Sequence, residues 1–205
     1  TTGKDYGRLL KETGAPIYHV GHLHYEGLYK NYGNFTELHA PSFKDEYHFR
    51  ISVVDNDMYS FSDLTLHEGP YVVITNPTDA RFYNEEMPLE KLKTTEQIRT
   101  LILSKESITS AYAKIDGKIV GNLTDANNNN IWTLEYDPSQ YTDGFHELEI
   151  IVHSGDESSV QSLTFNLEGK VQEYSPANMV WVYFAWPVTE IFTGLIVFVI
   201  AIGLA

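Results

Sequence analysis

The chain has 205 residues, with 28 acidic and 14 basic side chains and a formal net charge of −14. Binding to the phosphates of nucleic acids requires clustered Lys and Arg side chains, and the sequence contains no such cluster. We therefore expect no nucleic-acid binding through a basic surface. The absence of cysteine excludes disulfides, thiolate metal sites and cysteine nucleophiles.

Both ends of the sequence look cut. Residues 5–12 have the amphipathic pattern of a helix, whose apolar side requires a packing partner that nothing upstream supplies. The other end stops at Ala205 within an apolar run. A length of 205 residues fits one complete domain with a piece of another, so we expect a fragment of a longer protein.

Residues 1–68 form the first predicted region. Gly14 and Pro16 end the helical pattern, and the apolar residues 17–20 predict a strand that leads into the run Gly21-His22-Leu23-His24. This order of helix, strand and loop is the one by which α/β domains place ligands at a strand end. We therefore predict an α/β piece here, with further strands over residues 28–32, 47–54 and 58–64.

Residues 69–168 predict an all-β domain. Short apolar stretches alternate with turn sequences such as Asp116-Gly117 and Asp143-Gly144. Seven strands in about a hundred residues are typical of an immunoglobulin-like sandwich, in which Trp132 is a predicted core aromatic. The predicted strands are residues 71–75, 97–103, 108–115, 118–120, 131–136, 145–153 and 160–167.

Residues 169–205 predict a juxtamembrane linker and the start of a transmembrane helix. Aromatic side chains between residues 181 and 186 have the pattern of an interfacial belt. The following 15 residues, 191–205, carry no charge, against about 20 residues needed to cross a bilayer. We therefore expect a membrane-bound protein with membrane lipid as a partner, and we interpret Glu190 as a solvated helix start.

The pair His22 and His24 is the candidate site. Imidazole is the commonest neutral metal ligand, and two rings in one short loop can reach two cations roughly 4 Å apart. Gly21 would let the backbone turn sharply beside the ions. Taken alone, however, this spacing favours two surface histidines without a ligand.

A resemblance changes that balance. The run Gly21-His22-Leu23-His24 resembles the closing Gly-His-x-His motif of calcineurin-like metallophosphoesterases. The segments that follow are similar, in their order, to the transmembrane protein 62 family, in which a metallophosphoesterase domain precedes an immunoglobulin-like domain and membrane helices. These segments are residues 49–64, Ile74-Thr75-Asn76-Pro77, Lys114-Ile115-Asp116-Gly117, Tyr136-Asp137-Pro138 and residues 141–146.

The resemblance implies that residues 1–68 are the C-terminal end of a metallophosphoesterase domain. His22 would ligate one divalent ion of the Mn, Fe or Zn class and His24 a second. His24 would also lie near the phosphate-ester substrate as a catalytic residue, and the full-length protein would hydrolyse that ester with water activated by the two ions. The earlier ligand loops are not found here. The fragment alone is therefore predicted to be inactive, because tight sites generally use three or four protein ligands per ion.

Other polar residues receive weaker interpretations. His19 is interpreted as a packed strand residue rather than a third metal ligand. Asp55-Asn56-Asp57 lacks the spacing of a calcium loop and predicts a hairpin turn. Asn34 and Asn122 begin glycosylation sequons. If either is used, the soluble part lies in the secretory pathway or outside the cell.

Two alternatives stay open. The chain could belong to a membrane-anchored immunoglobulin-like binding or adhesion protein without catalysis, in which the sandwich carries the function. It could also be a structural anchor for membrane helices that transport or signal. The three interpretations differ in the sequence they require upstream, because only the enzyme needs further metal-ligand loops before residue 1.

Overall fold

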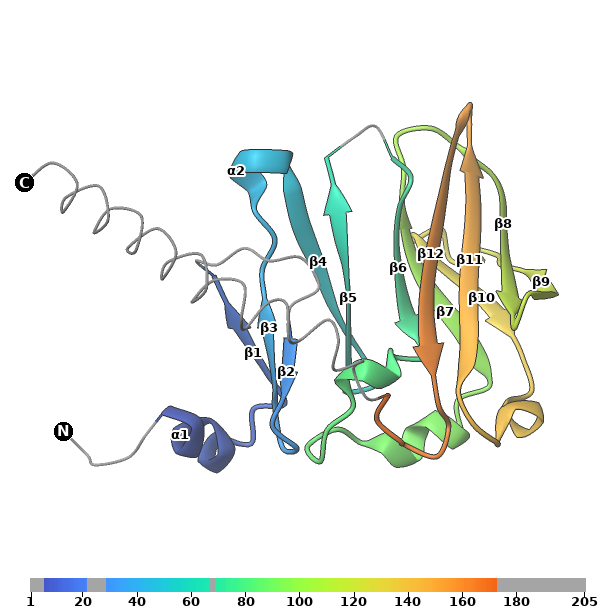
Figure 1. The fold of residues 1–205 in the computed structure, drawn as a ribbon. Coiled ribbons are helices and arrows are strands. Elements are labelled where there is room, and N and C mark those ends of the chain that lie inside the picture. The colour runs from blue at the N-terminus through green and yellow to red at the C-terminus, as the bar shows by residue number, and fades with distance from the viewer. Residues whose placement is uncertain (1–5, 22–28, 67–68, 173–205) are drawn as a thin grey trace, which may run out of the picture. The chain divides into compact units, whose positions relative to one another are not determined.

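The computed structural model of the chain describes residues 6–21, 29–66 and 69–172. Within these ranges the regular structure is mostly β-strand, as Figure 1 shows. The longest described helix is α1, Tyr6–Thr13, which has eight residues. The residue that follows it is Gly14, whose φ of 63° is a left-handed conformation that glycine adopts without strain.

A small sheet follows α1. Strand β1, Ile17–Val20, runs parallel to β3, Thr36–His39, and β3 pairs on its other side with the antiparallel strand β2, Tyr29–Asn31. The strand order is therefore β1-β3-β2. The parallel pairing continues past the strands, since the Ala40 amide donates to the Val20 carbonyl at 2.8 Å.

A β-hairpin comes next, after the four-residue helix α2, Phe43–Glu46. Its strands are β4, His48–Asp55, and β5, Met58–Thr65, which pair along their whole length. The two turn residues, Asn56 and Asp57, have φ angles of 52° and 64°. Two left-handed residues in a two-residue loop make the turn that suits the strand twist, so the predicted hairpin is confirmed.

The α/β architecture predicted for the first region is wrong. Described residues 6–66 form a three-stranded sheet and a two-stranded hairpin, with helical structure limited to α1 and α2. The order of helix, strand and loop is the basis of the prediction, but the described residues between these paired strands contain no helix of the kind that covers an α/β sheet. Strand β3, which no sequence pattern predicted, lies at the centre of the first sheet.

The expected membrane helix is not part of the described structure. No helix within residues 6–21, 29–66 and 69–172 is long and apolar enough to cross a membrane. The run over residues 191–205 and the neighbouring Glu190 lie outside these ranges.

Residues 69–172 hold seven strands in two antiparallel sheets. One sheet has the order β10-β7-β6, and the other has the order β12-β11-β8-β9. Three short 3-10 helices lie in two of the connections, η1 and η2 between β6 and β7 and η3 between β10 and β11. The elements are β6 (Tyr71–Asn76), η1 (Ala80–Phe82), η2 (Leu89–Lys93), β7 (Gln97–Leu103), β8 (Ile108–Ile115), β9 (Lys118–Asn122), β10 (Ile131–Glu135), η3 (Pro138–Tyr141), β11 (His146–Ser154) and β12 (Glu157–Phe165).

One apolar core joins the two sheets. Leu148, Ile150 and Val152 of β11 are fully buried and pack in one cluster with side chains of β6 and β7. Their spacing of two residues places them on one face of the strand, as the sequence pattern predicts. Trp132 is half-buried against this cluster. The predicted strand over residues 145–153 begins one residue later, at His146, and Phe145 before it is exposed.

Candidate functional site

The predicted metal ligands His22 and His24 lie outside the described residues. The chain is described as far as Gly21, which is exposed and has no atom within 4 Å of the place where a Cβ would lie. Within the described ranges, no three His, Asp or Glu side chains are grouped so as to hold a metal ion. The assignment of one metal ion to His22 and a second to His24 therefore stays a prediction.

His19 lies on β1, and both of its ring nitrogens have partners. Its Nε2 is 2.8 Å from the Tyr59 hydroxyl, and its Nδ1 is 3.4 Å from Nη1 of Arg50. Partial burial of the ring lowers the pKa of His19, and the Arg50 charge lowers it further against the opposing effect of Asp63. The neutral imidazole can accept from Arg50 and donate to Tyr59. His19 is nevertheless the exposed residue of β1, so polar contacts at the surface hold its ring, and it is not packed in the interior as expected.

Arg50 and Asp63 form an ion pair across the hairpin. Two parallel contacts join them, from Nε to Oδ1 at 2.6 Å and from Nη2 to Oδ2 at 2.8 Å. The Arg50 side chain is only 8% exposed, and its guanidinium lies 4.2 Å from the centre of the Phe61 ring. Nη2 also donates to the His39 carbonyl at 2.7 Å. The pair therefore fixes the hairpin to strand β3.

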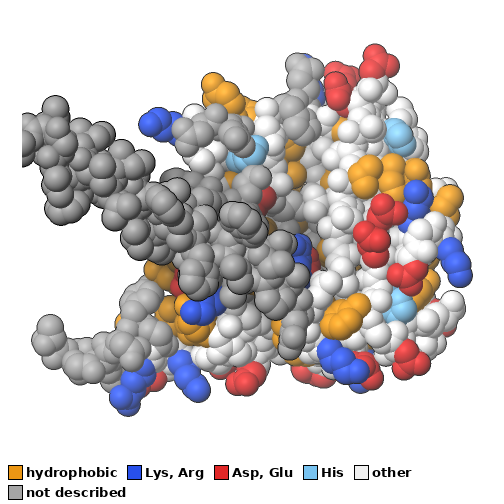
Figure 2. All heavy atoms as spheres, in the orientation of Figure 1, with side chains coloured by type: hydrophobic (Ala, Val, Ile, Leu, Met, Phe, Trp, Pro, Cys, Tyr) orange, Lys and Arg blue, Asp and Glu red, His pale blue; other side chains and the backbone are white. Residues whose placement is uncertain are grey.

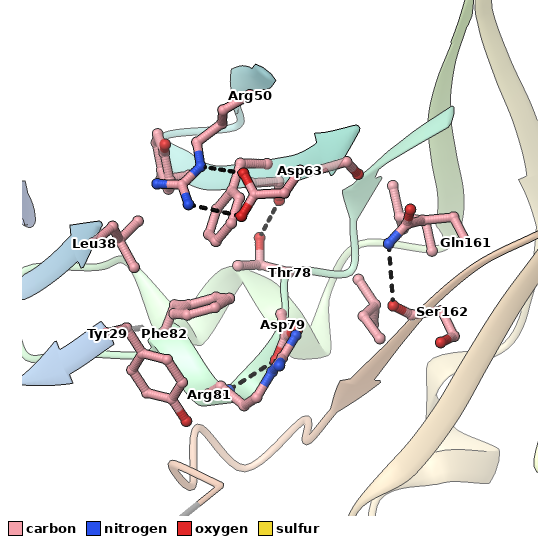
Figure 3. A pocket seen from close by; sticks show the side chains of 16 residues that line it. Tyr29, Leu38, Arg50, Asp63, Thr78, Asp79, Arg81, Phe82, Gln161 and Ser162 are labelled. Carbon is pink, nitrogen blue, oxygen red and sulfur yellow. Dashed lines mark hydrogen bonds and ion pairs between the residues drawn. The ribbon is translucent and has the colours of Figure 1, made fainter. Parts of the chain in front are cut away.

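The hairpin, η1 and β12 enclose a cavity of about 290 Å³. Figure 3 shows the Arg50–Asp63 pair on one side of it and a second pair, Asp79 with Arg81, on the other. Oδ2 of Asp79 lies 2.5 Å from Nη2 of Arg81, and Oδ1 accepts the Arg81 amide at 2.9 Å. The remaining lining residues are Tyr29, Leu38, Tyr59, Ser60, Phe61, Ser62, Ile74, Thr78, Phe82, Gln161, Ser162 and Leu163.

Sequence patterns did not point to this cavity. Its residues come from β2, β3, the hairpin, β6, η1 and β12, which only the tertiary structure brings together. Figure 2 shows acidic and basic side chains interspersed on the visible face, so the excess of acids does not gather there into one patch.

A second group of polar residues surrounds a wider hollow beside η3. His146 Nδ1 lies 2.7 Å from Oδ2 of Asp116, and the Glu147 amide donates to Oδ1 at 3.0 Å. Burial acts to raise the pKa of Asp116, but these hydrogen bonds and the charges of His146 and Lys118 outweigh it and lower the pKa. The contacts hold the turn between β8 and β9 against β11.

The two glycosylation sequons lie in different surroundings. Asn34 is buried, and the Nδ2 atom that would carry the glycan is shielded from solvent. This burial does not favour a glycan on Asn34, and its modification stays a prediction. Asn122 is exposed at the end of β9, and its modification stays a prediction.

Two antiparallel sheets of three and four strands around one core define an immunoglobulin-like β-sandwich. A family model described as "TMEM62 Ig-like domain" matches residues 66–171, which is just over half of the chain. The chain therefore belongs to the transmembrane protein 62 family.

One mouse relative is named Transmembrane protein 62. It is 34% identical over 145 residues, which cover 67% of this chain and 22% of the relative. The chain thus spans about a fifth of the length of that protein. A solved structure, the endo-β-1,4-mannanase of Thermotoga petrophila, matches 34% of this chain and 16% of its own, with 14% identity and a TM-score of 0.30. So weak a likeness has no bearing on function.

Proposed function

We propose that the whole protein is a metal-dependent phosphoesterase and that this chain supplies two of its metal ligands, His22 and His24. The observation that carries the proposal is the run Gly21-His22-Leu23-His24, placed directly after β1 ends at Val20. A strand end is where a rigid scaffold presents ligands on a short loop. The membership of the transmembrane protein 62 family adds to this support.

The two histidines have separate roles in the proposal. His22 holds one ion and His24 holds the other, and His24 also lies near the substrate phosphate. Two bound cations lower the pKa of a water molecule and neutralise charge on the phosphate oxygens. The other ligands come from outside the described residues, because the latter hold no metal-ligand group.

The experiment uses the intact protein and two generic substrates, p-nitrophenyl phosphate and bis(p-nitrophenyl) phosphate. Replacing both His22 and His24 with Ala should abolish hydrolysis and bound metal together. His153→Ala is the matched control, because His153 is exposed on β11 in the sandwich and should be dispensable for both. A double variant that retains full metal content and full hydrolysis contradicts the proposal.

We also propose that the protein is attached to a membrane through its C-terminal residues. The support is the name of the mouse relative and the uncharged run over residues 191–205. In membrane fractions the intact protein should resist alkaline extraction and dissolve only in detergent. Release by alkaline carbonate would contradict membrane insertion.

A further inference from the structure

The chain contains two Asp-Gly sequences, Asp116-Gly117 and Asp143-Gly144. In such a pair the amide nitrogen of the glycine can attack the carboxyl carbon of the aspartate, because glycine has no side chain to hinder the approach. The attack needs a carboxyl group that is free to rotate towards the glycine amide. The surroundings of the two aspartates therefore decide which of them reacts.

The first pair is held by hydrogen bonds. Oδ2 of Asp116 lies 2.7 Å from Nδ1 of His146, and Oδ1 accepts from the Glu147 amide at 3.0 Å. The Asp116 amide also donates to the Glu147 carbonyl at 2.9 Å. Both bonds of the carboxylate must break before its carbon can reach the Gly117 amide, and hydrogen bonds to a charged group are costly to lose. The folded structure therefore protects Asp116.

The second pair lies in the connection between η3 and β11, where both of its residues are exposed. Within the described ranges, the Asp143 carboxylate and the Gly144 amide make no hydrogen bond. No atom beyond the neighbouring residues lies within 4 Å of the place where a Cβ of Gly144 would be. Lys170 is close enough to interact electrostatically with Asp143, but its ammonium group is paired with Glu168. The Asp143 carboxyl is therefore free to turn towards the Gly144 amide.

We infer that Asp143, of these two aspartates, is the site at which the protein forms isoaspartate spontaneously. The Gly144 amide nitrogen bonds to the carboxyl carbon of protonated Asp143 and loses its proton, and the carboxyl hydroxyl leaves with a proton as water. The product is a cyclic imide. Water then cleaves the original peptide C–N bond, so that the main chain runs through the former side-chain carboxyl carbon. One water leaves and one enters, no group is oxidised or reduced, and the reaction does not depend on the proposed phosphoesterase activity.

The rearrangement has a structural consequence at Asn166, which is fully buried. Its Nδ2 donates to the Gly144 carbonyl at 2.5 Å, and its Oδ1 accepts from the amides of Glu168 and Lys170 at 3.0 and 2.8 Å. Isoaspartate inserts one extra carbon into the main chain directly before Gly144, which shifts the Gly144 carbonyl away from its donor. A buried amide that loses its acceptor is unfavourable. We therefore expect residues 166–170 to loosen as isoaspartate accumulates.

The test ages the intact protein at neutral pH and physiological temperature and then measures isoaspartate in its peptides by mass spectrometry with electron-transfer fragmentation. Isoaspartate at Asp143 should exceed that at Asp116 at least about tenfold, because two charge-assisted hydrogen bonds protect Asp116. In protein aged in guanidinium chloride the two sites should react to a similar extent, because this protection is then absent. No isoaspartate at Asp143, similar amounts at both sites in the folded protein, or a ratio that unfolding does not change would overturn the inference.

The variant Asp143→Glu tests the consequence for Asn166. Glutamate does not readily form the corresponding six-membered imide, and Asp143 is exposed, so the variant should fold and resist the reaction. Asp156→Glu is the matched control, because Asp156 is exposed in the turn between β11 and β12 and does not precede a glycine. On ageing, hydrogen exchange of amides 166–170 should rise in the wild type and in Asp156→Glu and stay constant in Asp143→Glu. An equal rise in all three proteins overturns the assignment to Asp143.

Discussion

Arg50 and Asp63 lie directly opposite each other in the hairpin register and share two charge-assisted hydrogen bonds. The guanidinium is almost fully buried, whereas the carboxylate is 19% exposed. We predict that Asp63→Ala destabilises the hairpin by about 3 kcal/mol, because it leaves a buried cation without its counter-ion. Hydrogen exchange of the β4 and β5 amides, followed by mass spectrometry of the intact protein, measures this local free energy.

An exposed ion pair provides the control for that measurement. Arg8 and Glu12 lie one helical turn apart on α1 with an N–O distance of 3.0 Å, and their side chains are 64% and 39% exposed. Glu12→Ala should change stability by less than about 0.5 kcal/mol. Equal effects of Asp63→Ala and Glu12→Ala would contradict a special role for the buried pair.

Ile150 tests the core between the two sheets. It is fully buried on β11, whereas Ile119 of β9 is 69% exposed. We predict that Ile150→Ala costs about 2–5 kcal/mol through lost burial and a cavity, and that the same substitution at Ile119 costs at most about 0.5 kcal/mol. Urea unfolding of both variants measures the difference. Similar midpoints for the two would argue against the sandwich core described above.

The strands of the sandwich could be predicted from sequence because their signals are local. Alternating apolar residues such as Leu148, Ile150 and Val152 define a buried face, and turn residues such as Asn56 and Asp57 define where a strand reverses. Strand β3 lacks both signals. Leu38 is its one apolar residue, so no alternation of apolar side chains marks a buried face. Its pairing with β1 and β2 is decided by tertiary contacts.

The cavity could be predicted only in part. Once the turn at Asn56 and Asp57 is assigned, the hairpin register places Arg50 opposite Asp63. This pair can therefore be predicted from the sequence. Ser62 and Asp79 lie on elements whose approach depends on packing. For the histidine loop the sequence is informative and the structure is not. The motif indicates metal binding, but His22 and His24 lie outside the described residues.

Tyr136 makes the free energy of unfolding depend on pH in the alkaline range. Burial, with the nearby Tyr141 adding to its effect, raises the pKa of Tyr136 to about 12, whereas an unfolded tyrosine ionises near pH 10. Tyr136 therefore loses its hydroxyl proton at a lower pH in the unfolded chain than in the folded protein. The contribution of Tyr136 is fully present below about pH 10 and is lost as the pH rises through about 12.

The variant Tyr136→Phe isolates this contribution. Because the Tyr136 hydroxyl is buried without a hydrogen bond in the described structure, we expect the variant to be as stable as the wild type at about pH 8, or more so by about 1 kcal/mol. Between about pH 8 and pH 11 the wild type should lose about 1 kcal/mol more than the variant. Urea unfolding at both pH values measures this, and parallel losses would show that Tyr136 is not the cause.

The metal content of the intact protein tests the central claim most directly. His22 and His24 are proposed to hold different ions, so each single alanine variant should lose one ion while keeping the other. Elemental analysis after dialysis should find about two transition-metal ions per chain in the wild type and about one in His22→Ala and in His24→Ala. Unchanged metal content in both single variants, or a wild type without bound metal, would contradict the claim.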